Sequence, residues 1–130
     1  MLLDTSGLFA MFDANDQHHQ SAFEYFNVAN PKFCHNYVAL EFISLADARG
    51  HSRQQLLMFI GEITAQPDVT FVWVDPLMHG AAISMLMAQL DKRYSLCDAV
   101  SFLLMRDRRL REALTTDHHF EQAGFQRLLV

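Results

Sequence analysis

The amino-acid sequence predicts an α/β protein in which helices cover both faces of a central parallel sheet, a three-layer α/β/α arrangement. Strand-like and helical segments alternate along the whole chain. There is no Asn-Gly or similar hairpin signal, so successive strands are expected to run parallel through crossover connections. The opening strand, Leu2 and Leu3, is a plain apolar pair, typical of a strand that is buried on both faces.

The strands are predicted from apolar and β-branched segments that lie between helix-breaking residues. The clearest is VTFVWV, because it combines β-branched and aromatic residues. A weaker one precedes Asp117, and another closes the chain. The expected strands are residues 2–3, 32–36, 69–74, 111–115 and 125–130.

The helix ends are predicted from capping and breaking residues. Asn30-Pro31 stops one helix, Gly50 ends another, and Ser52 and Ser95 are expected N-caps. Asp75-Pro76 opens a further helix, with Asp as the cap and Pro at the first position. The expected helices are residues 7–12, 17–29, 37–48, 53–65, 76–90 and 96–106, followed by a helical turn at 118–123.

Two helices carry further expectations about burial. The helix at 37–48 is apolar nearly all round, which is typical of a buried helix. The helix at 76–90 carries Met78, Met85 and Met87, which we interpret as core-filling side chains.

Length and composition limit the class of protein. The 130 residues are expected to form one domain, residues 1–130, and 51% of them are hydrophobic. The net charge of −5 argues against a protein that coats nucleic acid by bulk charge, but it is compatible with a nuclease whose metal ions meet the phosphate.

The sequence also predicts a cytoplasmic protein that does not enter a membrane. No apolar run reaches the length of about 18 residues that spans a bilayer. The N-terminus lacks the basic region of a signal peptide and carries Asp4 where such a peptide would be apolar. Cys34 and Cys97 form no CxxC pair, so both are expected to be buried, reduced thiols.

Four acids each follow a predicted strand or open a helix on the same expected edge of the sheet. They are Asp4, Glu41, Asp98 and Asp117. Ligand sites of open α/β sheets lie outside the carboxyl ends of the strands, so the four are expected to converge. Each also has a structural alternative: Asp98 and Asp117 could cap helices, and Glu41 could be a surface charge. Asp4 is the hardest to explain structurally, because it continues an apolar strand.

Converging carboxylates repel one another unless a cation neutralises them. Hard oxygen ligands suit Mg²⁺ or Mn²⁺, which bind through a few carboxylates and substrate phosphates. The chemistry that such a site supports is hydrolysis of a phosphodiester bond.

In these segments the chain resembles the PIN domain family, in particular the VapC-type toxin ribonucleases. The resemblance covers nearly the whole chain and rests on the ordered segments LLDTSGLFA, YVALEFISLA, YSLCDAVSFLLM and TTDHHFEQAGF. It implies a metal-dependent endoribonuclease that is the toxin of a type II toxin–antitoxin pair, a homodimer and a cognate antitoxin protein. It also implies that Asp4, Glu41, Asp98 and Asp117 bind Mg²⁺ or Mn²⁺, with Ser6 and Thr116 as small polar neighbours. Some relatives carry a further acid at the position of His119, so the number of metal ions stays open.

Other functions compete with this interpretation. A solitary PIN-like ribonuclease or an inactive module that only binds a partner would share the same residues. A phosphatase or receiver-like phosphoryl-transfer domain also has an Asp after its first strand. Such phosphatases need a second Asp where this chain has Ser6, and both classes need a late lysine, whereas the lysines here are Lys32 and Lys92.

Two further groups of residues could contact ligands. Arg106, Arg108, Arg109 and Arg111 are the one basic concentration, and they would either contact RNA phosphates or form a solvated helix end. The pairs His18-His19 and His118-His119 could suggest zinc, but neighbouring helical residues point in different directions. We interpret them as surface histidines, with His118 or His119 near the substrate as the alternative.

Overall fold

A computed structural model describes residues 1–130 and contains one five-stranded sheet in the order β3-β2-β1-β4-β5, with every strand pair parallel. The predicted three-layer α/β/α fold is confirmed. The strands are β1 (Leu2–Leu3), β2 (Lys32–His35), β3 (Val69–Val72), β4 (Glu112–Leu114) and β5 (Gln126–Arg127). The helices are α1 (Thr5–Phe12), α2 (His19–Val28), α3 (Asn36–Ala48), α4 (Arg53–Thr64), α5 (Pro76–Ala88), α6 (Leu96–Asp107) and α7 (His119–Gln122).

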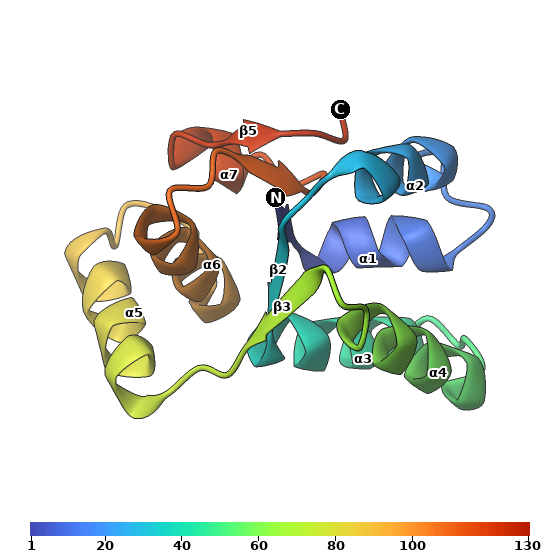
Figure 1. Cartoon of the computed structure of the whole chain (residues 1–130). Helices are drawn as coiled ribbons and strands as arrows, with labels where there is room; N and C mark the ends of the chain where they lie inside the picture. Colours follow the sequence, from blue (N-terminus) through green and yellow to red (C-terminus); the bar gives the residue numbers. More distant parts are fainter.

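The short strand β1 is the centre of the sheet. Leu2 lies opposite Phe33 of β2 and Ala113 of β4. Because successive side chains of a strand point to opposite faces, Leu3 packs into the core under α1 to α4, and Leu2 into the core under α6 and α7. Figure 1 shows α1 to α4 on one side of the strands and α5 to α7 on the other. Both leucines are fully buried, as the apolar pair predicts.

Several predicted boundaries were wrong by a few residues. Helix α1 begins at Thr5 rather than Gly7, because Asp4 already has the extended backbone of an N-cap. Helix α2 begins two residues late, since Asp16 Oδ1 accepts a hydrogen bond from the His18 backbone and holds a turn there. Strands β3 and β5 are shorter than expected, because a strand persists only where a neighbour pairs with it, and β5 pairs with β4 through Gln126 and Arg127 alone.

The prediction that α3 is a buried helix was also wrong, and of the three methionines interpreted as core-filling only Met78 and Met85 pack against the core. Helix α3 buries only Val38, Phe42 and Ala46, and its Leu40 is 65% exposed. Helix α5 buries only Ala82, and its Met87 is 66% exposed. Apolar residues around a whole helix predict burial, but these helices lie at the periphery of the chain and keep uncovered apolar faces.

Lys32, one of the two lysines of the chain, is part of the core rather than of the predicted site edge. Lys32 is fully buried and forms an ion pair with Asp68, which holds the pKa of Asp68 below its usual value. Lys32 lies at the start of β2, away from the carboxyl ends of the strands, so it is not the late lysine of a phosphoryl-transfer site.

Cys34 and Cys97 are both buried and free, as predicted. No helix in the structure has the length and apolar character needed to cross a membrane.

Candidate metal centre

Asp4 stands at the end of the central strand, and its side chain does not serve the helix that follows. It occupies the N-cap position of α1, yet its carboxylate makes no capping hydrogen bond. Instead Oδ2 accepts a hydrogen bond of 2.7 Å from Thr115 Oγ1, 111 residues away. Burial raises the pKa of Asp4 to about 7, the Thr115 hydrogen bond opposes the rise, and the charges of Asp98 and Glu41 add to it. Three of the predicted acids therefore lie within electrostatic reach of one another.

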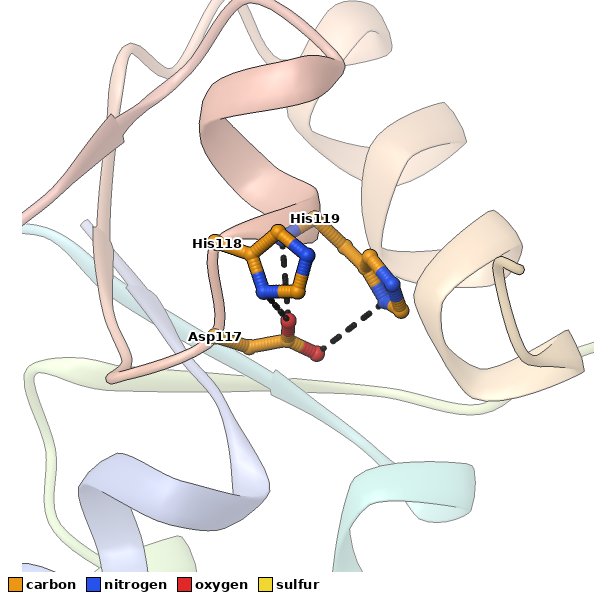
Figure 2. A group of neighbouring side chains, drawn as sticks. All are labelled: Asp117, His118 and His119. Carbon is orange, nitrogen blue, oxygen red and sulfur yellow. Dashed lines mark hydrogen bonds and ion pairs between the residues drawn. The ribbon is translucent and has the colours of Figure 1, made fainter. Parts of the chain in front are cut away.

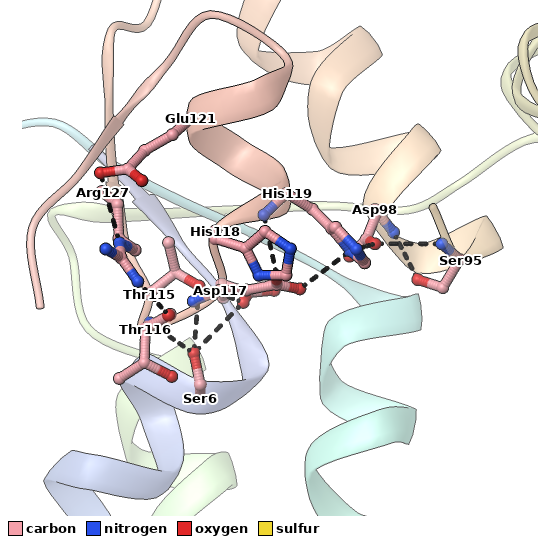
Figure 3. A network of polar contacts seen from close by, with 11 residues as sticks. Ser6, Ser95, Asp98, Thr115, Thr116, Asp117, His118, His119, Glu121 and Arg127 are labelled. Carbon is pink, nitrogen blue, oxygen red and sulfur yellow. Dashed lines mark hydrogen bonds and ion pairs between the residues drawn. The ribbon is translucent and has the colours of Figure 1, made fainter. Parts of the chain in front are cut away.

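A hydroxyl network fixes the segment between β4 and α7 against the start of α1. Thr115 and Ser6 lie 3.0 Å apart through their hydroxyl oxygens. Ser6 Oγ accepts a hydrogen bond from the Thr116 backbone, and Thr115 Oγ1 accepts one from the Asp117 backbone (Figure 3). Ser6 and Thr116 thus lie beside the acids, where the resemblance places them. Thr115 was missed, although the tract TTD directly before a candidate acid is the signal that could have identified it.

Asp98 combines its structural alternative with a place in the site. Its Oδ2 accepts a hydrogen bond from the Ser95 backbone, and Ser95 Oγ accepts one from the Asp98 backbone, which together form a capping box at the start of α6. Asp98 can cap α6 and also bind a ligand, because its other carboxylate oxygen, Oδ1, has no hydrogen-bond partner in the capping box.

His119 joins Asp98 to Asp117. Its ring Nδ1 lies 3.1 Å from Asp98 Oδ2 and 3.4 Å from Asp117 Oδ2. The other oxygen of Asp117, Oδ1, accepts a hydrogen bond from the His119 backbone and so holds the turn that leads into α7 (Figure 2). Like Asp98, Asp117 has both its structural role and a position in the cluster of acids.

The expectation that His118 and His119 point apart was wrong. Their ring centroids are 4.7 Å apart, and each ring has a nitrogen near the Asp117 carboxylate. Together with Asp117 they form a group of side chains that could hold a metal ion. The helix rule does not apply to this pair, because His118 is the N-cap residue and lies outside the regular part of α7.

Glu41 is the exposed member of the site. It lines a groove of about 430 Å³ together with Tyr37, Leu40, Leu96 and Cys97. The buried Cys97 lies close to three of the acids, because burial raises the pKa of its thiol and the charges of Glu41, Asp4 and Asp98 raise it further. Cys97 was missed as a neighbour of the acids, and the only signal for it in the sequence is its position next to Asp98.

The four arginines lie at the other end of α6. Arg106 is in its last turn, and Arg111 precedes β4. With a rise of about 1.5 Å per residue, Arg106 is about 12 Å along the helix from Asp98. All four are exposed, and Arg108 packs over the Phe33 ring. Contact with phosphate stays a prediction, and it would concern a part of the RNA away from the acids.

The residues at this edge fit a divalent cation. Asp4, Glu41, Asp98 and Asp117 offer carboxylate oxygens, the ligands that Mg²⁺ and Mn²⁺ prefer. The rise in the pKa of Asp4 to about 7 shows what burial and neighbouring negative charges impose when no cation balances them. A cation among these acids would offset part of that cost.

An all-parallel sheet of this strand order, with acids after β1, at the start of α6, on α3 and after β4, is the arrangement of a PIN domain. The structure of Mycobacterium tuberculosis VapC20, described as a sarcin–ricin loop cleaving toxin, superimposes with a TM-score of 0.86. The match has 25% sequence identity and covers 96% of this chain and 95% of that one. The chain therefore has the fold of a VapC-type PIN domain. No model of a protein family matches the sequence, and no curated protein matches it.

Proposed function

We propose that this protein is a divalent-metal-dependent endoribonuclease and the toxin of a type II toxin–antitoxin pair, acting in the cytoplasm. The observation that carries the proposal is the convergence of acids around Asp4, in a fold that VapC20 shares. Because VapC20 is a toxin that cleaves the sarcin–ricin loop, the proposal also agrees with the resemblance of the sequence.

The side chains would divide the work of hydrolysis. Asp4, Asp98, Asp117 and Glu41 would hold Mg²⁺ or Mn²⁺, which would lower the pKa of a bound water and stabilise the leaving oxygen. Thr115 holds the Asp4 carboxylate in place, and the Ser95 backbone holds that of Asp98. Glu41, which is exposed in the groove, would in addition accept a proton from the attacking water.

The test is cleavage of defined RNA hairpins, among them a sarcin–ricin loop, with EDTA, Mg²⁺ or Mn²⁺. Cleavage should require the metal and should be lost in Asp4→Asn and in Asp98→Asn, whose amides keep the shape but lose the charge. Circular dichroism should show that both variants remain folded. Undiminished cleavage by both variants, in preparations free of other nucleases, would refute the proposal.

We further propose a homodimer, with helix α5 in the interface. This helix is apolar on nearly every side, yet Leu77 is 83% exposed, Leu90 just beyond it is 78% exposed, and only Ala82 is buried. Light scattering should give twice the chain mass for the native protein. Leu77→Glu, which places a charge in this apolar surface, should shift it toward the monomer.

A cognate antitoxin would be a second partner. The groove that leads to Glu41 is lined by the apolar side chains of Tyr37, Leu40 and Leu96, so a protein segment that fills it would cover the acids. We expect a short reading frame next to the gene of this protein, encoding a protein with a DNA-binding N-terminus. The purified complex of the two proteins should not cleave RNA. The absence of such a reading frame would favour a solitary ribonuclease instead.

A further inference from the structure

We propose that His119 is a metal ligand of this centre through its ring Nδ1, so that the site selects Mn²⁺ and similar first-row transition ions over Mg²⁺. The inference rests on the proposed function, since it assumes that a divalent cation binds among the four acids. It concerns the identity of the ion, which the acids alone leave open.

The spacing of the three candidate ligand atoms supports this assignment. Ligands of Mg²⁺-sized ions lie at about 2.1 Å, so neighbouring ligand atoms around one octahedral ion are about 3.0 Å apart. His119 Nδ1 lies 3.1 Å from Asp98 Oδ2 and 3.4 Å from Asp117 Oδ2. His119 Nδ1 therefore already lies at nearly the spacing of neighbouring ligands from one oxygen of each of the two carboxylates (Figure 3).

The His119 ring is held in this position from several sides. The Tyr94 ring contacts it edge to face, with centroids 5.5 Å apart. The His119 backbone donates to Asp117 Oδ1, which leaves Oδ2 of that carboxylate facing the ring. The side chain of His119 is 19% exposed, whereas that of His118 is 63% exposed. Ring orientation is thus set by packing and by the turn, and not only by attraction to the acids.

At His119 Nδ1 a metal ion can take the place of the hydrogen. His119 Nδ1 forms a hydrogen bond with Asp98 Oδ2, and because an ionised carboxylate only accepts, Nδ1 carries the hydrogen. A cation bound by Nδ1 would take the place of that hydrogen, and the neutral ring would carry its hydrogen on Nε2 instead.

The donor set then decides which ion binds. Mg²⁺ prefers oxygen ligands and surrenders water reluctantly, whereas imidazole nitrogen suits first-row transition ions. A neutral ring at the position of a carboxylate also removes one negative charge, which weakens attraction for a hard ion that depends mainly on charge. Both effects move the preference from Mg²⁺ toward Mn²⁺, Co²⁺ or Zn²⁺.

His118 is the matched control. Its Nδ1 lies 3.7 Å from Asp117 Oδ1, the oxygen that the His119 backbone already occupies. His118 is also 63% exposed and lies beside one carboxylate rather than two, although it is the direct neighbour of His119 and carries the same ring (Figure 2).

The experiment measures binding of Mn²⁺ and Mg²⁺ to the purified native protein by calorimetry, and to His119→Asp and His118→Asn. We expect Mn²⁺ to bind more tightly than Mg²⁺, and His119→Asp to reduce that ratio by at least about tenfold, since it restores an oxygen ligand. His118→Asn should change the ratio by less than about twofold. Pulsed electron paramagnetic resonance of bound Mn²⁺ should show a directly coordinated nitrogen in the native protein and none in His119→Asp.

The possible outcomes separate this inference from the proposed function. Native protein that binds Mn²⁺ without a coordinated nitrogen would overturn the role of His119, whatever the variants do, and leave the acid site intact. Mn²⁺ that binds native protein and Asp98→Asn equally would show that the acids do not hold the ion, and would overturn both. A ratio that is unchanged in His119→Asp would likewise refute the selection that we assign to this ring.

Discussion

At the scale of single residues, two of the site aspartates combine a structural hydrogen bond with free ligand capacity. Asp98 caps α6, and Asp117 holds the turn before α7. Asp4 differs, because it makes no cap and lies in the interior with 5% exposure. No capping role explains the burial of its carboxylate. Substitution of Asp4 is therefore the best way to measure how much the site lowers the free energy of unfolding.

Asp4→Asn should stabilise the metal-free protein at pH 8. The amide oxygen can still accept from Thr115, while the buried charge near Asp98 and Glu41 is removed. With EDTA, Tm should rise by at least about 4 °C, which corresponds to about 1 kcal/mol in a domain of this size. Saturating Mn²⁺ should raise Tm of the native protein more than that of the variant, because an ion that binds only the folded state stabilises it. A lower Tm for the variant in EDTA would contradict this account of Asp4.

Gly7→Ala should destabilise the protein strongly. A Cβ at Gly7 would lie 2.0 Å from the backbone oxygen of Leu114, so α1 and β4 would have to separate. Overpacking of this kind costs about 1 to 3 kcal/mol or more, and here the displaced groups include the Ser6–Thr115 contact. Urea unfolding measures the change in the free energy of unfolding.

Gly61→Ala is the matched control for this substitution. Gly61 lies inside α4, and a Cβ there would meet nothing within 4 Å. Alanine should therefore stabilise the helix by about 0.5 to 1 kcal/mol. Equal losses of stability in the two variants would show that the close approach of α1 to β4 is not the cause.

At the scale of elements, a buried histidine couples the helices that carry Glu41 and Asp98. His35 Nδ1 accepts a hydrogen bond from the Val38 backbone and so caps α3. Its Nε2–H can then donate to Ser101 Oγ of α6, at 2.8 Å. Burial lowers the pKa of His35 to about 4, so the ring stays neutral in the folded protein. The relative position of two site acids thus depends on an uncharged imidazole.

This histidine predicts a loss of stability in acid. The pKa of His35 is lowered from 6.5 to about 4 on folding, so between these values the unfolded state binds more protons and stability rises with pH. Acidification from pH 7 to pH 4 should remove about 3 kcal/mol. Asp4 acts in the opposite sense over this range, because its pKa is raised. The dependence of stability on pH is therefore measured by chemical denaturation of the Asp4→Asn variant, in which position 4 does not titrate.

The control is the double variant Asp4→Asn/His35→Asn. Asparagine is a good N-cap, so it can replace the bond to the Val38 backbone without titrating in this range. The slope of stability between pH 4 and pH 6.5 should become shallower in the double variant. A slope that is the same in both proteins would assign the acid sensitivity to other groups.

At the scale of the whole molecule, charge is divided between the two ends of α6. Acids surround its N-terminus, and the arginines gather at its C-terminus. An RNA that reaches the acids could also cross the arginines, about 12 Å away along the helix. Such contacts would contribute affinity but not the chemistry of the cut.

The double variant Arg109→Gln/Arg111→Gln should weaken binding of RNA and flatten its dependence on salt. Each arginine that binds a phosphate in the native protein should, when replaced, reduce the slope of log affinity against log salt by about one unit. Fluorescence anisotropy of labelled RNA, measured over a series of KCl concentrations, gives this slope. The rate of cleavage at saturating RNA should stay unchanged. A slope equal to that of the native protein would identify the arginines as solvated surface.

Much of the architecture could be predicted from local sequence patterns. The apolar pair Leu2-Leu3, the β-branched run at β3 and the caps Ser52, Asp75 and Ser95 all have their expected roles. These features act over a few residues, through side-chain period and backbone hydrogen bonds. Boundaries such as those of α1 and β5 could not be predicted as well, because they depend on caps and on pairing with distant strands.

The sequence by itself determined the alternation of elements, the parallel sheet and the expectation that acids after the strands meet at one edge. Only the tertiary structure decided that Thr115 binds Asp4, that Cys97 lies among the acids, and that the His119 ring bridges Asp98 and Asp117. The pattern of a strand and its cap depends on neighbours in the chain. A contact between side chains 21 or 111 residues apart depends on the packing of whole helices against the sheet, which no local pattern specifies.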